Sequence, residues 1–155
     1  MFMILIADDN ENDTLVIVKM LRAAGVKSRI ITVGDGRDVI AYFQGKNEYA
    51  DREKYPLPSV LLLDLKMAQI GGFGVLEWLN GTGLAKDVLS IILSGFGELE
   101  NIRRGYQLGA RSFLTKPCRL DEIQNLIRTY SSYWQAGAMV SEDQADRQDS
   151  LVEPA

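Results

Sequence analysis

Four short apolar runs that each end in a polar residue constrain the fold more than any other feature of this chain. The runs and the residues after them are 2–7 before Asp8 and Asp9, 60–63 before Asp64, 88–93 before Ser94, and 112–115 before Lys116. Runs this apolar are typical of parallel strands covered by helices on both faces. Because the carboxyl ends of parallel strands share one edge of a sheet, these side chains are expected to converge.

Three carboxylates, a hydroxyl and an ammonium at one edge indicate a chemical site. Crowded carboxylates repel one another unless a cation lies among them, and Mg²⁺ prefers oxygen ligands at about 2 Å. Taken singly, the acids could be helix N-terminal charges, Ser94 a turn residue and Lys116 a solvated charge. Helix capping would not also require a lysine at the same edge, however. The set therefore predicts metal binding combined with phosphoryl chemistry.

Composition narrows the function classes. The 155 residues, 46% hydrophobic and 25% charged, fit one folded domain. The net charge of −4 falls in the C-terminal tail, so the body offers no attraction for nucleic acid. Because the chain has no histidine, a phosphohistidine carrier, a Ser-His-Asp hydrolase and a His-ligated zinc site are excluded.

The single cysteine, Cys118, cannot form an internal disulfide, which agrees with a reducing compartment. The apolar start lacks the basic flank of a signal peptide, and no apolar run approaches membrane-spanning length. We therefore expect a cytoplasmic protein with no membrane partner, in which Cys118 is an ordinary, partly buried thiol.

The order of elements predicts an α/β fold with five β-α units. Strands are expected at 2–7, 27–33, 60–63, 88–93 and 111–115, and helices after the first strand and at 37–44, 75–79, 98–108 and 120–133. Right-handed crossovers between parallel strands favour a doubly wound, three-layer sandwich. The connection 46–58 is interpreted as a solvated loop, with an extra helical turn or a partner contact as alternatives.

We expect a folded domain at 1–134 and a mobile, acidic tail at 135–155. Nothing after Tyr133 is long enough for a winged helix or an output enzyme, so output is expected through protein contact. The expected contact surface involves Ile102, Tyr106 and Arg111, and it is also a candidate homodimer interface. Burial of these side chains in the core is the alternative.

Four motifs resemble those of the receiver domain of two-component response regulators, over about residues 3–133. They are Ile6-Ala7-Asp8-Asp9-Asn10, Leu61-Leu62-Leu63-Asp64-Leu65-Lys66-Met67, Leu93-Ser94-Gly95-Phe96, and the stretch 109–117 that ends in Thr115-Lys116-Pro117. The resemblance implies a flavodoxin-like, five-stranded parallel sheet in the order 2-1-3-4-5. It also implies a cis bond between Lys116 and Pro117.

By this resemblance, Asp64 is the phosphoacceptor. Asp9 and Asp64 would bind Mg²⁺ together with the backbone carbonyl of Lys66, and Asp8 would assist through water. Carboxylates suit the metal, while a lysine neutralises charge on the equatorial phosphoryl oxygens.

The same resemblance assigns phosphoryl binding and switching to Ser94 and Lys116, with Phe113 as the coupled aromatic residue. A plain core phenylalanine is the alternative for Phe113. The loop at 68–72 departs from the usual Pro-x-Met/Leu-Asp-Gly of the family, which leaves its rigidity open. Lys66, two residues beyond the acceptor, is predicted to alter the lifetime of the phosphoryl group.

The resulting hypothesis is a single-domain response regulator that accepts a phosphoryl group on Asp64 from a histidine kinase and switches a surface for a downstream protein. Enzymatic activity would be limited to self-phosphorylation and self-dephosphorylation. Residues 49–58 resemble stand-alone regulators paired with phytochrome-type kinases. The alternative is a pseudo-receiver that interacts without phosphorylation. An FMN carrier is disfavoured by the acids after the first strand, and a haloacid dehalogenase-type phosphatase by Lys66 in place of a second Asp.

Overall fold

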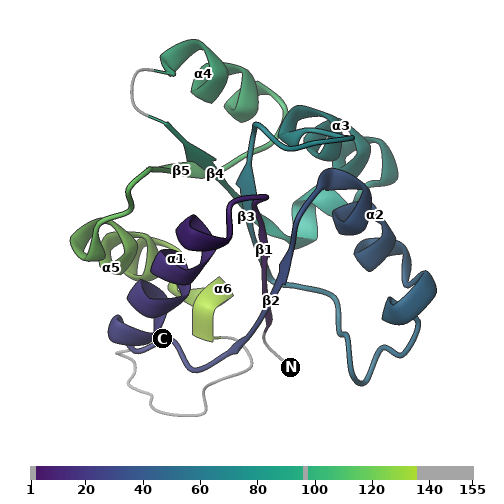
Figure 1. Ribbon diagram of the computed structural model, residues 1–155, viewed down its shortest axis with the longest axis horizontal. Coiled ribbons are helices and arrows are strands. Elements are labelled where there is room, and N and C mark those ends of the chain that lie inside the picture. Colours follow the sequence, from purple (N-terminus) through teal and green to yellow (C-terminus); the bar gives the residue numbers. More distant parts are fainter. Residues whose placement is uncertain (1–2, 96–97, 136–155) are drawn as a thin grey trace.

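The computed structural model describes residues 3–95 and 98–135, and Figure 1 shows how their elements are arranged. Predictions for Phe2 and for the acidic tail at 136–155 lie outside the described residues. Within the described ranges, no helix has both the length and the apolar character needed to cross a membrane.

A five-stranded, all-parallel sheet forms the centre of the molecule. Its strands are β1 (Met3–Ala7), β2 (Arg29–Val33), β3 (Val60–Asp64), β4 (Leu89–Ser94) and β5 (Ser112–Thr115), in the order β2-β1-β3-β4-β5. The helices are α1 (Glu11–Ala23), α2 (Gly36–Gln44), α3 (Gly72–Thr82), α4 (Leu99–Gln107), α5 (Leu120–Thr129) and α6 (Ser131–Gln135). The predicted doubly wound fold and strand order are confirmed.

Helices cover both faces of the sheet and make three layers (Figure 1). One core cluster joins α2 and α3 to alternate strand residues such as Leu5 and Leu61. A second cluster joins α1, α5 and α6 to the intervening residues, such as Ile4 and Leu62. Because successive side chains of a strand point to opposite faces, a strand buried on both faces must be apolar throughout. This explains why β1 and β3, which are buried throughout, appear in the sequence as uninterrupted apolar runs, whereas the edge strands β2 and β5 include polar residues.

The C-terminal helical segment differs from the prediction. A single helix over 120–133 is wrong, because α5 ends at Thr129 and α6 begins at Ser131. Between them Tyr130 has a non-helical backbone, and its hydroxyl donates to the Arg111 carbonyl at 2.9 Å. The change of direction lets Trp134 enter the core cluster of α1 and α5. Burial of a large aromatic side chain thus outweighs helix continuity here.

The connection 46–58 is not the solvated loop that the sequence suggested. It contains a 3₁₀ turn, η1 (Asn47–Tyr49), and the buried ring of Tyr49 lies 4.8 Å from that of Tyr42 and 5.3 Å from that of Tyr55. Arg52 donates hydrogen bonds to the carbonyls of Tyr42, Phe43 and Tyr55 at 2.8, 2.6 and 3.1 Å. The alternative of an extra helical turn is therefore correct, and the connection packs against α2.

Candidate functional site

Strand register brings the predicted site residues to one edge of the sheet. Ala7 pairs with Leu63, so Asp8 and Asp64 follow on neighbouring strands. Ser94 pairs with Thr115, and the Lys116 amide donates to the Ser94 carbonyl at 2.7 Å. The carboxyl ends of β1, β3, β4 and β5 therefore meet at this edge, as the sequence predicted.

Three carboxylates form an acidic cluster. Each of Asp8, Asp9 and Asp64 offers an oxygen within 4.8 Å of the others, with Asp8 and Asp64 buried and Asp9 exposed. The Asp8 Oδ1 atom also accepts from the Asn10 amide at 3.0 Å, which orients the carboxylate. A cavity of about 440 Å³ adjoins Asp8 and Asp9 on the side of α1 and β2, and Asp64 does not line it. Hard oxygen donors that crowd together fit a hard divalent cation such as Mg²⁺.

Lys116 reaches into this cluster from the end of β5. Its Nζ atom lies 2.7 Å from Asp8 Oδ2, 3.1 Å from Asp13 Oδ2 and 3.3 Å from Asp64 Oδ2. Burial lowers the pKa of Lys116, but its hydrogen bonds to Asp8 and Asp13 and the charge of Asp64 outweigh it and raise the pKa above its usual value. The Lys116–Pro117 peptide bond is cis, as expected.

Both carboxylate oxygens of Asp64 have partners. Its Oδ1 atom accepts from the Lys66 amide at 3.1 Å, and its Oδ2 atom accepts from Lys116. Burial raises the pKa of Asp64, and the neighbouring charge of Asp8 adds to this, while the Lys66 amide and Lys116 oppose it. One ammonium only partly neutralises the cluster, so the site retains negative charge that a second cation could balance.

Ser94 lies at the same edge but its hydroxyl is engaged elsewhere. The side chain is buried, and Oγ donates to the neighbouring Gly95 carbonyl at 3.0 Å. A phosphoryl oxygen would have to replace that carbonyl as the acceptor.

Phe113 is not a plain core residue. Its side chain is 38% exposed, and its ring packs edge-on against Tyr106 at 6.3 Å between centroids. Tyr106 and Arg111 are also exposed, the latter with its guanidinium 5.8 Å from the rings of Tyr130 and Tyr133. Ile102 is buried, so its expected place on the contact surface is wrong.

The loop after Asp64 is anchored in spite of its unusual sequence. The Gly36 amide donates to the Ile70 carbonyl at 3.0 Å, and the Gly72 amide donates to the Leu65 carbonyl at 3.2 Å. Arg37 also hydrogen-bonds the Gln69 side chain. A Cβ atom on Gly36 would lie 2.1 Å from the Ile70 oxygen, so only glycine permits this approach. The Val75 amide donates to the Gly71 carbonyl at 3.2 Å, so α3 begins at Gly72 rather than near Val75.

Two polar residues at the site were not found from the sequence. Asp13 contacts Lys116, and Glu98 forms an ion pair of 2.5 Å with Lys66 while accepting from the Gly95 amide. The hydrogen bond from Lys66 lowers the pKa of Glu98. Neither acid follows a strand directly, so the strand-end pattern carried no signal for them.

Comparisons with known proteins agree with this geometry. Residues 4–128 match the family described as "Response regulator receiver domain". The response regulator Rcp1 of Synechocystis is 24% identical over 131 residues, covering 84% of this chain and 87% of Rcp1. The crystal structure of response regulator RPA3017, in red light signaling of R. palustris, has a TM-score of 0.74 and 26% identity, covering 92% of this chain and 100% of that one. The phosphorylated cyanobacterial phytochrome response regulator RcpA has a TM-score of 0.71 and 25% identity, covering 89% and 96%.

Proposed function

Because the chain belongs to the response regulator receiver domain family, we propose that it accepts a phosphoryl group on Asp64 from a histidine kinase and uses Mg²⁺ to do so. One observation carries the proposal: the carboxylates of Asp8, Asp9 and Asp64 and the Lys116 ammonium meet at one sheet edge. We also propose that the protein acts in the cytoplasm. Residues 1–134 would form the domain that carries the phosphoryl group, and residues 135–155 a separate tail.

Asp64 is the best placed of the acids to act as the nucleophile. The Asp8 side chain is fully buried and holds Lys116 most closely, whereas Asp9 is exposed. In the transfer, an Asp64 carboxylate oxygen attacks phosphorus and an O–P bond forms. The P–N bond to the kinase histidine breaks, and its electron pair stays on the imidazole nitrogen. Later attack of water on phosphorus would release inorganic phosphate and restore the carboxylate, which is the self-dephosphorylation expected of this protein.

The charges around Asp64 divide this work. Asp8, Asp9, Asp64 and the Lys66 carbonyl would hold the metal ion, Asp8 through water, and the ion would neutralise phosphoryl oxygens. Lys116 keeps a positive charge over the usual pH range and supplies the second cation. Alignment and charge neutralisation are the main requirements of phosphoryl transfer, so no further base is needed.

The switch is proposed to run from Ser94 to the exposed aromatic pair of Tyr106 and Phe113. The Ser94 hydroxyl has an ordinary acceptor in the Gly95 carbonyl, and a charged phosphoryl oxygen is a stronger one. Movement of Ser94 would free space for Phe113, which lies on the adjacent strand β5 and contacts Tyr106. The surface around Tyr106, Arg111 and Phe113 is the proposed contact for a downstream protein or a second copy of this chain.

The similarity to RcpA, described as a cyanobacterial phytochrome response regulator, favours a phytochrome-type kinase as the phosphoryl donor. The anchored connection 46–58 has a defined shape that such a kinase could recognise. We propose that the downstream target is a protein.

Incubation with acetyl phosphate and Mg²⁺, followed by intact-mass measurement, tests the proposal. We expect the mass of one phosphoryl group to be added, and the addition to be lost in Asp64→Asn. The matched control is Asp87→Asn, which changes an exposed acid two residues before the start of β4. This variant should still gain the mass of one phosphoryl group. A parent protein that gains no mass would instead support the pseudo-receiver.

A further inference from the structure

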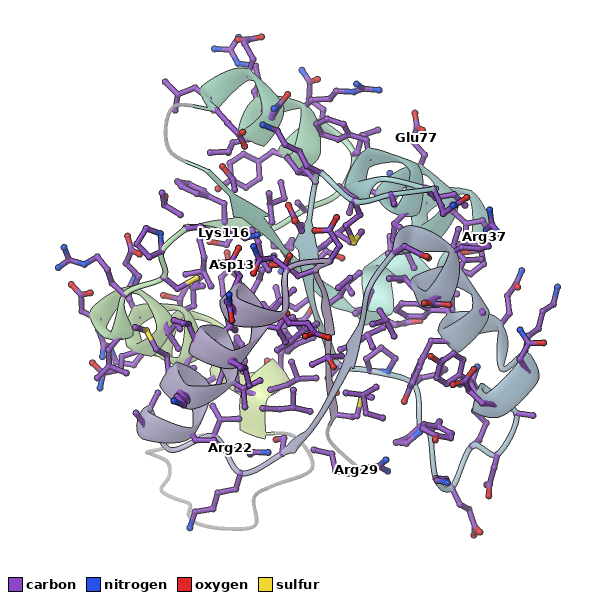
Figure 2. All side chains as sticks on the ribbon, viewed as in Figure 1. Asp13, Arg22, Arg29, Arg37, Glu77 and Lys116 are labelled. Atoms are coloured by element: carbon purple, nitrogen blue, oxygen red, sulfur yellow. The ribbon has the colours of Figure 1, made fainter. Side chains whose placement is uncertain are left out.

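Lys116 contacts three aspartates that come from different elements of the fold. Asp8 and Asp64 lie at strand ends, whereas Asp13 lies in the first turn of α1, and Figure 2 shows Asp13 beside Lys116. The Lys116 Nζ atom has three carboxylate oxygens within 3.3 Å, and it donates a hydrogen bond to that of Asp64. A phosphoryl group on Asp64 removes the charge of that carboxylate, so Asp8 and Asp13 are the carboxylates left to compete with the phosphoryl oxygens for this ammonium.

Of these two carboxylates, Asp13 costs less to release. The side chain of Asp8 is 0% exposed, so it would lose its partner while it remained buried. The Asp13 side chain is 39% exposed, and water can replace Lys116 as its partner. Its backbone is held independently, because the Asp13 amide donates to Asn10 Oδ1 at 3.0 Å.

Asp13 is also outside the acidic cluster. The oxygens that lie within 4.8 Å of one another belong to Asp8, Asp9 and Asp64. A cation bound there would compensate those three acids but not Asp13. Once Asp64 carries a phosphoryl group, Asp13 and the new anion would face the same ammonium.

We propose that Asp13 is a positioning residue that competes with the phosphoryl group for Lys116 and so sets how readily the site takes up a phosphoryl anion. The proposal rests on the proposed function of Asp64. With the phosphoryl group absent, the Asp13 carboxylate forms an ion pair with Lys116. With the group present, Asp13 turns to solvent and Lys116 binds the phosphoryl oxygens.

Beryllofluoride, which mimics a phosphoryl group without a covalent step, provides the test in the presence of Mg²⁺. Binding is followed by ¹⁹F NMR, and we expect Asp13→Asn to lower the half-saturating concentration about two- to fivefold, the range of a partly exposed ion pair. Asp13→Glu keeps the charge and should stay near the parent. Glu11→Gln removes one negative charge from the same helical turn and forms no ion pair among the residues that the structure describes.

Two further measurements separate competition for Lys116 from a general change in charge. Mg²⁺ binding measured alone should not tighten in Asp13→Asn, since removing an acid cannot attract a cation. In a Lys116→Gln background, Asp13→Asn should no longer improve beryllofluoride binding, as a double-mutant cycle requires of a direct contact.

The outcomes are distinct. If the parent does not bind beryllofluoride, the proposed function of Asp64 fails and this inference fails with it. If the parent binds but Asp13→Asn binds equally or more weakly, only the competition is refuted, and Asp13 would instead orient Lys116 toward the site. An equal gain in Glu11→Gln and Asp13→Asn would also refute it, because the effect would then come from charge in general.

Discussion

Two regions bury polar groups beside the aliphatic core: the connection 46–58, and the edge of the sheet that carries Asp8, Asp64 and Lys116, here called the site edge. They differ in how those groups are satisfied. In the connection, the Arg52 guanidinium donates to three backbone carbonyls, which are neutral acceptors. At the site edge, three carboxylates surround the single ammonium of Lys116 and hold excess negative charge. The first arrangement stabilises the fold, whereas the second gives up stability to leave charge available for binding.

The largest effect is expected where the connection is broken. Arg52→Ala should lower the free energy of unfolding by about 3 kcal/mol, because three carbonyls lose their donor and the packing of the arginine stem is lost. Chemical denaturation measures this, with Lys46→Ala, an exposed cation in the same connection, as the control. Equal stabilities of the two variants would show that the connection is an ordinary surface loop.

The next largest effect concerns the loop after Asp64, which docks on the start of α2. Gly36→Ala places a methyl group against the Ile70 carbonyl and should cost about 2 kcal/mol of stability. It should also slow phosphorylation by acetyl phosphate, because the loop after Asp64 must shift. Gly34→Ala is the matched control, since a Cβ atom there has no neighbour within 4 Å. If the two variants phosphorylate at the same rate, loop anchoring does not matter for the site.

A smaller effect of opposite sign is expected at the site edge. Asp64→Asn should raise the free energy of unfolding by about 1 kcal/mol at neutral pH while abolishing phosphorylation. Because burial raises the pKa of Asp64 in the folded state, its contribution to stability is present below the unfolded pKa of about 4 and is lost as the pH rises above it. The gain in the variant should therefore grow with pH from about 4 upward and vanish in acid. A variant less stable than the parent at pH 7 would contradict the comparison.

The smallest effect is expected at Lys66, two residues beyond Asp64. Lys66→Asn removes the ion pair with Glu98 and a positive charge near the acceptor, and the half-life of the phosphorylated protein should shorten by up to about fivefold. Decay of the phosphorylated mass over time measures this, and Lys86→Asn, at an exposed site in the turn before β4, is the control. If the hydrolysis rate is unchanged, Lys66 does not modulate phosphoryl lifetime.

Local patterns predicted the strand-end residues but not their partners. Asp8, Asp64 and Lys116 follow buried strands directly, and parallel register then leaves them little choice of position. Asp13 and Glu98 reach the site from a helix turn and from the residue before α4, which no periodicity in the sequence relates to a strand end. The break at Tyr130 was likewise unpredictable, because its cause is a hydrogen bond to Arg111 and the burial of Trp134.

The sequence by itself determined the α/β class and the edge at which the acids and the lysine meet, because apolar runs and parallel topology depend on local chemistry and chain connectivity. The strand order followed from the resemblance of the motifs to those of receiver domains. Only the tertiary structure decided that Lys116 is shared by three acids, that Glu98 pairs with Lys66, and that the connection 46–58 packs against α2. Those contacts join residues far apart in the chain. Their distances depend on how the layers pack, and packing is a property of the whole fold rather than of any segment.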